Sequence, residues 1–387
     1  MPIPIRFSSF MQKEKMKMHK AFSSAQRQAQ DTMPSPKDML PDITVVQATY
    51  RTSIYKRLLI LGCLIMSVIL SLGATFLVGP AHLSPALFLQ TLFNSASVPQ
   101  QTAIIVWQIR MPYALMAACV GGALGLAGAE MQTVLANPLA SPFTLGVSAA
   151  GAFGASLAIV LQWHIPGVPD NWLVAGCAFI FSVFSVFALD LLTRLRQADT
   201  STVILCGVAL VFSFQSLVAL MQFVASEDTL QDLVFWTLGS LSRATWATLA
   251  LLAGSLALIF PFSLRAAGGL TLLQMGEERA ASLGIDIPHL RRAALLRISL
   301  LCALSVAFVG VIGFVGLVAP HIARRLVGED HHFSLPGSLL TGALILSVSA
   351  LVARILVPGI IVPLGIITSL VGIPFFLAII LKQRPMV

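Results

Sequence analysis

The chain has 387 residues, of which 57% are apolar and only 10% are charged, and its mean hydropathy is +0.89. A soluble globular domain has about 45 to 50% apolar and about 25% charged residues, so these values exclude an ordinary soluble protein and indicate an integral membrane protein. The five cysteines all lie in apolar runs without CxxC spacing, which argues against disulfides, zinc sites and iron–sulfur ligation.

The first 57 residues form a basic segment with ten Lys or Arg and four Asp or Glu, and they supply +6 of the formal net charge of +8. They contain no apolar core of the kind that a cleavable secretory signal requires. We interpret residues 1–57 as a disordered cytoplasmic tail that anionic lipid headgroups attract. Residues 58–384 then form the transmembrane domain.

Nine apolar stretches reach the roughly 20 residues that a helix needs to cross the hydrocarbon core. The apolar run from Ala293 to Val327 is too long for one crossing, because it would make a helix of about 50 Å. It must break, and the residues that favour a break are Gly310, Gly313, Gly316 and Pro320. A short helix then follows a full span, and the ten predicted spans lie at about 58–78, 111–136, 142–162, 172–193, 202–225, 244–263, 293–314, 319–327, 336–357 and 363–381.

The charges favour ten spans with both chain ends in the cytoplasm, because cytoplasmic flanks carry an excess of Lys and Arg. With this topology the inner segments hold 21 of the 24 basic residues. The outer side keeps only Arg110, Arg243 and Arg354. A nine-span topology would place Lys382 and Arg384 outside, against the rule.

The sequence lacks the motifs that are typical of several kinds of enzyme and carrier. No GxxxxGK[ST] loop occurs, so an ATP-driven role needs a partner. HExxH, GxSxG and metal-ligand clusters are also absent, which argues against a membrane enzyme. An ion-coupled carrier needs ionisable groups inside the membrane, and Glu130 is the only acidic residue well within a span. We interpret Glu130 as a carboxyl that a neighbouring helix satisfies or that stays hydrated near the inner interface.

Three segments carry recognisable motifs. The first contains RxP from Arg110, NPLAxP from Asn137, and small residues at Gly121, Gly125 and Ala129 and again at Gly146, Ala150 and Gly154. Small residues at this spacing predict close helix packing. The second, at about 268–290, should form a short amphipathic helix pair on the cytoplasmic face, which Glu277 and Glu278 open and Gly284 closes. The third joins GFxGLxxPH from Gly313 to PxGxxTxxxGxPFF from Pro363.

In this order, the patterns RxP, GAxxQ, NPLAxP, GEExAxxLG, GFxGLxxPH and PxGxxTxxxGxPFF resemble the FecCD-type permeases, the membrane subunits of ABC importers for iron-siderophore, haem and cobalamin. The resemblance covers residues 55–384. It implies an all-α, ten-helix fold of the type II importer permeases, in the inner membrane and without enzymatic activity. The implied partners are a second, identical permease subunit, a cytoplasmic ATPase dimer that uses ATP and Mg, and a periplasmic or lipid-anchored substrate-binding protein; neither a nucleic acid nor a cofactor or metal of its own is expected.

The resemblance also assigns roles to residues. The residues that it implies for coupling to the ATPase are Gly276, Glu277, Glu278, Ala281, Leu283 and Gly284. Those that it implies for docking of the binding protein are Arg110 and Arg354. The residues that it implies for the translocation path and its helix packing are Gly121, Gly125, Gln132, Asn137, Pro138, Gly146, Gly151, Gly316, Pro320 and Gly365. Two positions depart from the family pattern: Tyr113 replaces a frequent second arginine, and Glu130 replaces a small or apolar residue. The expected cargo is an iron(III)-siderophore, with haem or cobalamin as the alternative.

Overall fold

The computed structural model describes residues 16–20, 22–24, 43–79, 84–94, 97–195, 200–357 and 360–382. Most of the predicted tail, residues 1–57, lies outside the described residues. Residues Met1–Lys56 and Arg57–Val387 form two compact units, and the account below concerns the second. The helix α2, Ile43–Leu77, starts earlier than the predicted span at 58, since a helix satisfies its own backbone hydrogen bonds in water as well as in lipid.

The regular elements of the second unit are helices, and the β-structure among its described residues is a single bridge between Val357 and Ile360. Its remaining elements, in chain order, are α3 (Pro85–Phe93), α4 (Gln100–Ile104), η2 (Ile105–Arg110), α5 (Met111–Val134), α6 (Val147–Val160), α7 (Asp170–Leu195), α8 (Thr200–Val224), α9 (Glu227–Thr237), η3 (Leu241–Arg243), α10 (Trp246–Gln274), α11 (Glu277–Ser282), α12 (Ile287–Val309), α13 (Val315–Val327), α14 (His331–Ile355) and α15 (Leu364–Lys382).

Seven helices of the described part are long and apolar enough to cross a membrane. They are part of α2, the continuous helix made by α4, η2 and α5, and the helices α7, α8, α10, α12 and α14. The helices α6 and α15 are apolar but shorter. The all-helical membrane fold is therefore confirmed, whereas ten crossings and cytoplasmic chain ends stay predictions.

Several helix boundaries differ from the predicted spans: α12 is Ile287–Val309 instead of 293–314, α13 starts at Val315 instead of 319, and α14 starts at His331 instead of 336. The helix α6 begins at Val147, not near 142, because the chain turns after α5 and Gly146 holds a φ of +88° that starts the new helix. The helix α10 continues to Gln274, beyond the predicted end at 263. Hydropathy marks only the apolar part of a helix, so a helix that extends past the membrane looks shorter in the sequence.

The predicted break in the run from Ala293 to Val327 is confirmed, between Val309 and Val315. Gly310 lies there with a φ of +82°, which L side chains rarely adopt. Pro320 is not at the break but inside α13. Because proline has no N–H, the carbonyl of Gly316 lacks its helical partner, and this carbonyl lies so close to Gly128 that a Cβ there would be 1.9 Å from the oxygen.

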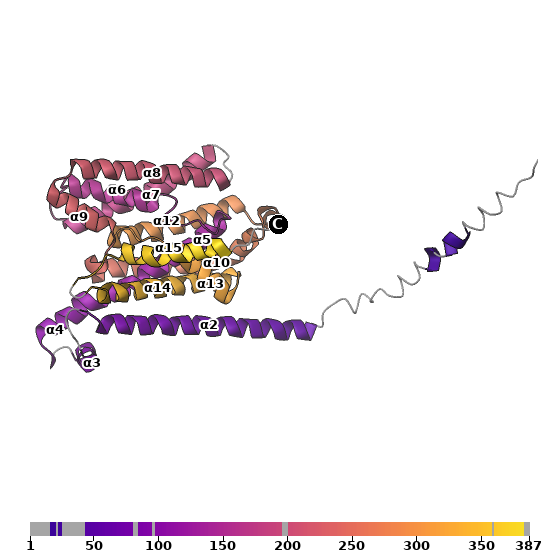
Figure 1. Cartoon of the computed structure of the whole chain (residues 1–387), viewed down its shortest axis with the longest axis horizontal. Helices are drawn as coiled ribbons and strands as arrows, with labels where there is room; N and C mark the ends of the chain where they lie inside the picture. The colour runs from indigo at the N-terminus through magenta and orange to yellow at the C-terminus, as the bar shows by residue number, and fades with distance from the viewer. Residues whose placement is uncertain are drawn as a thin grey trace, which may run out of the picture. The chain divides into compact units, whose positions relative to one another are not determined.

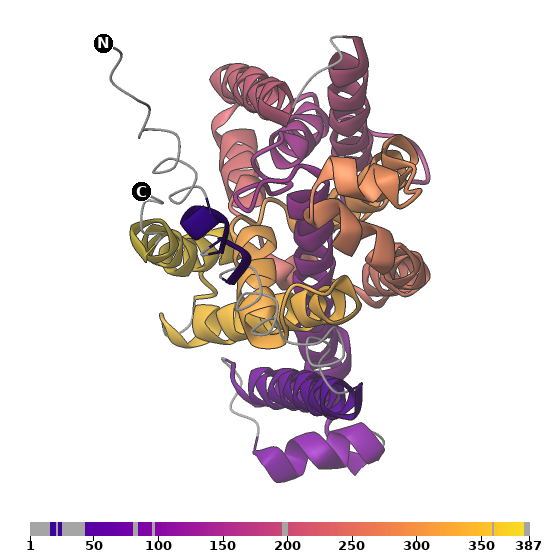
Figure 2. The same cartoon turned by 90° about the vertical axis from the view of Figure 1, so that its right-hand side faces the viewer.

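The helix α5 occupies the middle of the unit. It packs against α10, α12, α13 and α14, and Figures 1 and 2 show it surrounded by other helices, with α6, α7 and α8 together on one side. Backbones touch where α5 meets α14: a Cβ on Gly121 would be 2.3 Å from the carbonyl oxygen of Gly342, and one on Gly125 would be 2.2 Å from that of Ser338. Only glycine permits this approach.

Candidate functional site

The functional side chains lie at two opposite ends of the bundle. The helix α10 starts just after α9 and η3 and ends just before α11, so α9 and α11 mark its two ends. We call these the α9 end and the α11 end. The sequence predicts that the α11 end is cytoplasmic.

The short helix α11 forms at the predicted place, with two acidic residues in its first turn. Gly276 and Gly284 flank it with φ values of +119° and +83°, so both turns require glycine. Ala280 is fully buried and attaches the helix to the bundle, whereas Glu278, Ala281 and Leu283 are exposed. The structure thus shows one short helix and the start of α12 where the sequence suggested a helix pair.

Arg291 of α12 connects α11 to the end of α5. One of its terminal nitrogens forms an ion pair with the Glu277 carboxylate. Its Nε donates to the carbonyl oxygen of Val134 at 3.2 Å. This carbonyl is among the last of α5, which have no helical partner. A single guanidinium therefore holds three elements together.

Glu130 of α5 is buried and paired with Arg297 of α12. The Arg297 guanidinium donates three hydrogen bonds to the carboxylate, at 2.8 to 3.1 Å. Glu130 is 1% exposed. Of the two interpretations made from the sequence, the structure therefore favours a carboxyl that a neighbouring helix satisfies, since charge-assisted bidentate bonds are among the strongest hydrogen bonds in proteins.

A polar network beside this pair joins α5 to α13, α14 and α10. Gln132 accepts a hydrogen bond from Arg324 and donates to the carbonyl oxygen of Leu317 at 3.2 Å. The buried ring of His331 contacts the hydroxyls of Thr133 at 2.7 Å and Thr271 at 3.1 Å. The predicted path residue Gln132 is therefore held in a network at the α11 end.

The two arginines predicted to dock a binding protein are buried at the opposite end. Arg110 donates to the carbonyl oxygens of Phe76 and Leu77 at 2.7 and 3.0 Å. Arg354 donates to those of Thr75 and Val78 at 3.0 and 3.2 Å, and lies over the Tyr113 ring at 3.7 Å. Both cations thus cap the C-terminal end of α2. Docking through them would require an exchange of these carbonyls for carboxylates, and it stays a prediction.

The remaining predicted path residues lie at turns and helix contacts. Asn137 and Pro138 form the turn after α5, where the Asn137 side chain accepts from the backbone N–H of Leu139 at 2.8 Å. Gly151 faces Ser182 of α7 and Val306 of α12. The N–H of Gly365 donates to the carbonyl oxygen of Leu238 at 3.0 Å, which attaches the start of α15 to the end of α9. Their part in a translocation path stays a prediction.

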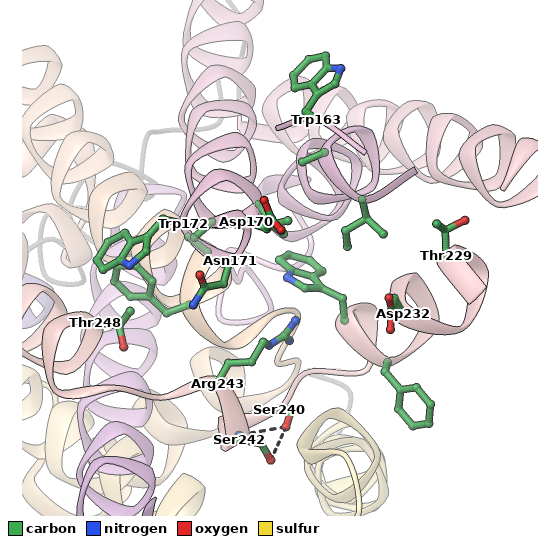
Figure 3. A pocket seen from close by; sticks show the side chains of 18 of the residues that line it. Trp163, Asp170, Asn171, Trp172, Thr229, Asp232, Ser240, Ser242, Arg243 and Thr248 are labelled. Atoms are coloured by element: carbon green, nitrogen blue, oxygen red, sulfur yellow. Dashed lines mark hydrogen bonds between the residues drawn. The ribbon is translucent and has the colours of Figure 1, made fainter. Parts of the chain in front are cut away.

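A cavity of about 780 Å³ opens at the α9 end. The ends of α6, α7, α10 and α12 line it, together with α9 and η3. Figure 3 shows its polar side chains, with Asn171 and Trp172 on one side, Asp232 on the other and Arg243 between them. In the sequence Arg243 stands out only as an outer charge, and no pattern there indicates the cavity.

Sequence reasoning also missed Arg291, Arg297, Arg324 and His331. One signal was available for Arg297, because a carboxylate inside a span needs a cation and Arg297 lies near the same predicted membrane face as Glu130. The other three belong to loops and helix ends, where solvated charges are common and no spacing marks a partner.

Comparison with known proteins agrees with this architecture. The sequence model of the FecCD transport family matches residues 63–382. The chain belongs to the FecCD transport family. It is therefore a transport permease and a multi-pass protein of the inner membrane.

Relatives within the FecCD family carry different cargo names. The hemin transport system permease protein HmuU of Yersinia pestis is 36% identical over 85% of this chain and 96% of its own length. The vitamin B12 import system permease protein BtuC of Vibrio parahaemolyticus is 33% identical over 83% and 93%. The Fe(3+) dicitrate transport system permease protein FecD of Escherichia coli is 34% identical over 72% and 86%.

A solved structure has the same fold. It is a metal-chelate type ABC transporter in an inward-facing conformation, with a TM-score of 0.73 and 30% sequence identity. The match covers 84% of this chain and 99% of the solved one. The FecCD fold therefore accounts for nearly the whole second unit.

Proposed function

We propose that this FecCD permease is the membrane subunit of an ATP-driven importer that carries an iron(III)-siderophore into the cell. Membership of the family is the observation that carries the proposal. A permease relative named for Fe(3+) dicitrate supports a ferric cargo. In this proposal the α11 end faces the cytoplasm, and the spans tilt to expose the path alternately to the two sides.

The ATPase subunits contact α11 in this proposal. The exposed side chains of Met275 and Leu283, at 58% and 64% exposure, give them an apolar contact surface. Buried Ala280 and the Glu277–Arg291 ion pair hold α11 on the bundle, against α10 and α12. A push on α11 would therefore reach the membrane helices instead of bending a loop.

The binding partners can be tested directly. The chain, solubilised in mild detergent with its cellular partners, should retain an ATPase subunit that hydrolyses Mg-ATP. The mass of the purified assembly should correspond to two copies of this chain, and a periplasmic or lipid-anchored binding protein should associate with its outer face. Uptake that follows a proton gradient without ATP would contradict the importer and favour an ion-coupled carrier.

The cargo is tested by uptake. An iron-starved strain that lacks this gene should regain accumulation of a radioactive ferric siderophore when the gene is restored. If only haem or cobalamin uptake recovered, the importer function would be supported but the siderophore would be wrong as its cargo. The hemin and vitamin B12 relatives make these two the comparisons to run in parallel.

Charge reversal on α11 should uncouple the importer. Glu278→Arg places a cation on the exposed surface that meets the ATPase, and like-charge or unpaired contacts there disfavour docking. We expect uptake to fall at least about tenfold while the abundance of the chain in the membrane stays normal. ATP hydrolysis should no longer respond to cargo.

Arg292→Glu is the matched control for Glu278→Arg. Arg292 is also exposed and lies near the same end of the bundle, but on α12. Its reversal should leave uptake close to that of the unmodified chain. Normal uptake by Glu278→Arg would show that α11 is not the contact that couples the permease to the ATPase.

A further inference from the structure

The cavity at the α9 end contains a cation, Arg243, that forms no ion pair with a described carboxylate. The guanidinium of Arg243 lies over the ring of Trp236 at 5.5 Å and contacts the carbonyl oxygen of Val309 at 3.5 Å. Burial lowers the pKa of Arg243 to about 10, so the group stays positively charged at neutral pH.

Donors and aromatic rings surround this cation. Asn171, Ser240 and Thr248 line the same cavity. The Asn171 amide is a hydrogen-bond donor, whereas the Ser240 and Thr248 hydroxyls donate to the Ser242 hydroxyl and to the carbonyl oxygen of Thr245, at 3.1 and 3.0 Å. Trp172 and Phe308 form an aromatic wall, edge to face at 6.1 Å between ring centroids. In Figure 3, Arg243 extends from η3 to a position between Trp172 and Asp232. Such a site suits a ligand with an oxygen-rich anionic group and an apolar body.

Two carboxylates also line the cavity, and both are solvated. The Asp170 side chain is 78% exposed and pairs with His164 at 3.1 Å, and Asp232 is exposed on α9. Water screens exposed charges strongly. Half-buried Arg243 therefore sets the sign of the charge deep in the cavity, while the rim is acidic.

We propose that this cavity is an outer subsite for the cargo, and that Arg243 binds a carboxylate group of a metal chelate there. The inference rests on the proposed importer and narrows its cargo to chelates that carry a free carboxylate. The aromatic wall of Trp172 and Phe308 contacts the body of the chelate, and the Asn171 amide donates to one of its remaining oxygens.

The test compares two ferric chelates on the full chain in lipid nanodiscs. Equilibrium dialysis with radioactive iron measures the affinity for ferric citrate, which carries carboxylates, and for a neutral ferric trihydroxamate, which has none. Ferric citrate should bind at least about tenfold more tightly, the effect of one charge-assisted hydrogen bond. Gallium(III) citrate should change the tryptophan emission, because Trp163, Trp172 and Trp236 line the cavity.

Substitutions then locate the binding group. Arg243→Gln should lower the affinity for ferric citrate at least about tenfold. Arg243→Lys should lower the affinity less, because the positive charge remains. Arg265→Gln is the matched control, since Arg265 also lies over an aromatic ring, Phe262 at 5.4 Å, but outside the cavity. It should leave the affinity unchanged.

Several results would overturn the subsite. One is equal affinity for the two chelates, and another is an equal effect of Arg243→Gln and Arg265→Gln on that affinity. A third is that Arg243→Gln no longer captures the binding protein but still binds ferric citrate with unchanged affinity, which would assign Arg243 to docking. Association with the ATPase is measured in the same preparations. Its absence from the unmodified chain would contradict the importer itself, whatever the chelates do.

Discussion

Arg297→Met should lower the free energy of unfolding by about 3 to 5 kcal/mol, because it leaves the buried Glu130 carboxylate without its cation. Glu130 is 1% exposed and cannot reach water to compensate. Denaturant titration of the purified protein in mixed micelles, followed by tryptophan emission, measures the loss.

The double variant Glu130→Met/Arg297→Met is the informative comparison. It removes both charges, and replacement of a buried ion pair by apolar residues of similar volume is often close to neutral. We expect it to be more stable than Arg297→Met alone. Additive losses from the two single substitutions would show that the carboxylate and the guanidinium do not interact.

The same pair decides between two kinds of transporter. If Glu130 carried the coupling proton of a carrier, Glu130→Gln would abolish uptake while the protein still reached the membrane in normal amounts. In the importer the substitution acts on stability, and the variant that folds should still transport. Uptake divided by the amount of folded protein separates the two outcomes.

Gly125→Ala should be strongly destabilising, although it adds only one methyl group. The added Cβ would lie 2.2 Å from the carbonyl oxygen of Ser338 and 3.2 Å from the Cα of Gly342. Both are backbone atoms, so α5 and α14 must move apart and lose contacts along their length. Overpacking of this kind costs about 1 to 3 kcal/mol or more, and denaturant titration in mixed micelles measures it.

Gly254→Ala provides a control of opposite sign. Gly254 lies inside α10, and a Cβ there would meet nothing within 4 Å. Alanine in a helix interior is favoured over glycine by about 0.5 to 1 kcal/mol, so this variant should be slightly more stable. Similar losses from the two substitutions would contradict the close approach of α5 to α14.

The helices themselves follow from local sequence. The break after Val309, the short helix at Glu277 and the apolar runs depend on glycine, proline, helix caps and hydropathy, all of which act within a few residues. These signals were readable, and the order of the motifs was enough to indicate the FecCD family. The boundaries of α6 and α10 were less accurate, because hydropathy neither distinguishes an apolar turn from the helix that follows it, as before α6, nor marks where a helix ends beyond its apolar part, as in α10.

The partners of the charged side chains were decided only by the tertiary structure. Glu130 and Arg297 are 167 residues apart in the chain, and their contact depends on which faces of α5 and α12 pack together. The burial of Arg110 and Arg354 against the end of α2, and the cavity around Arg243, have the same origin. Local patterns determine which residues form helices and which must avoid lipid, whereas the pairing of a charge depends on packing between segments that share no sequence signal.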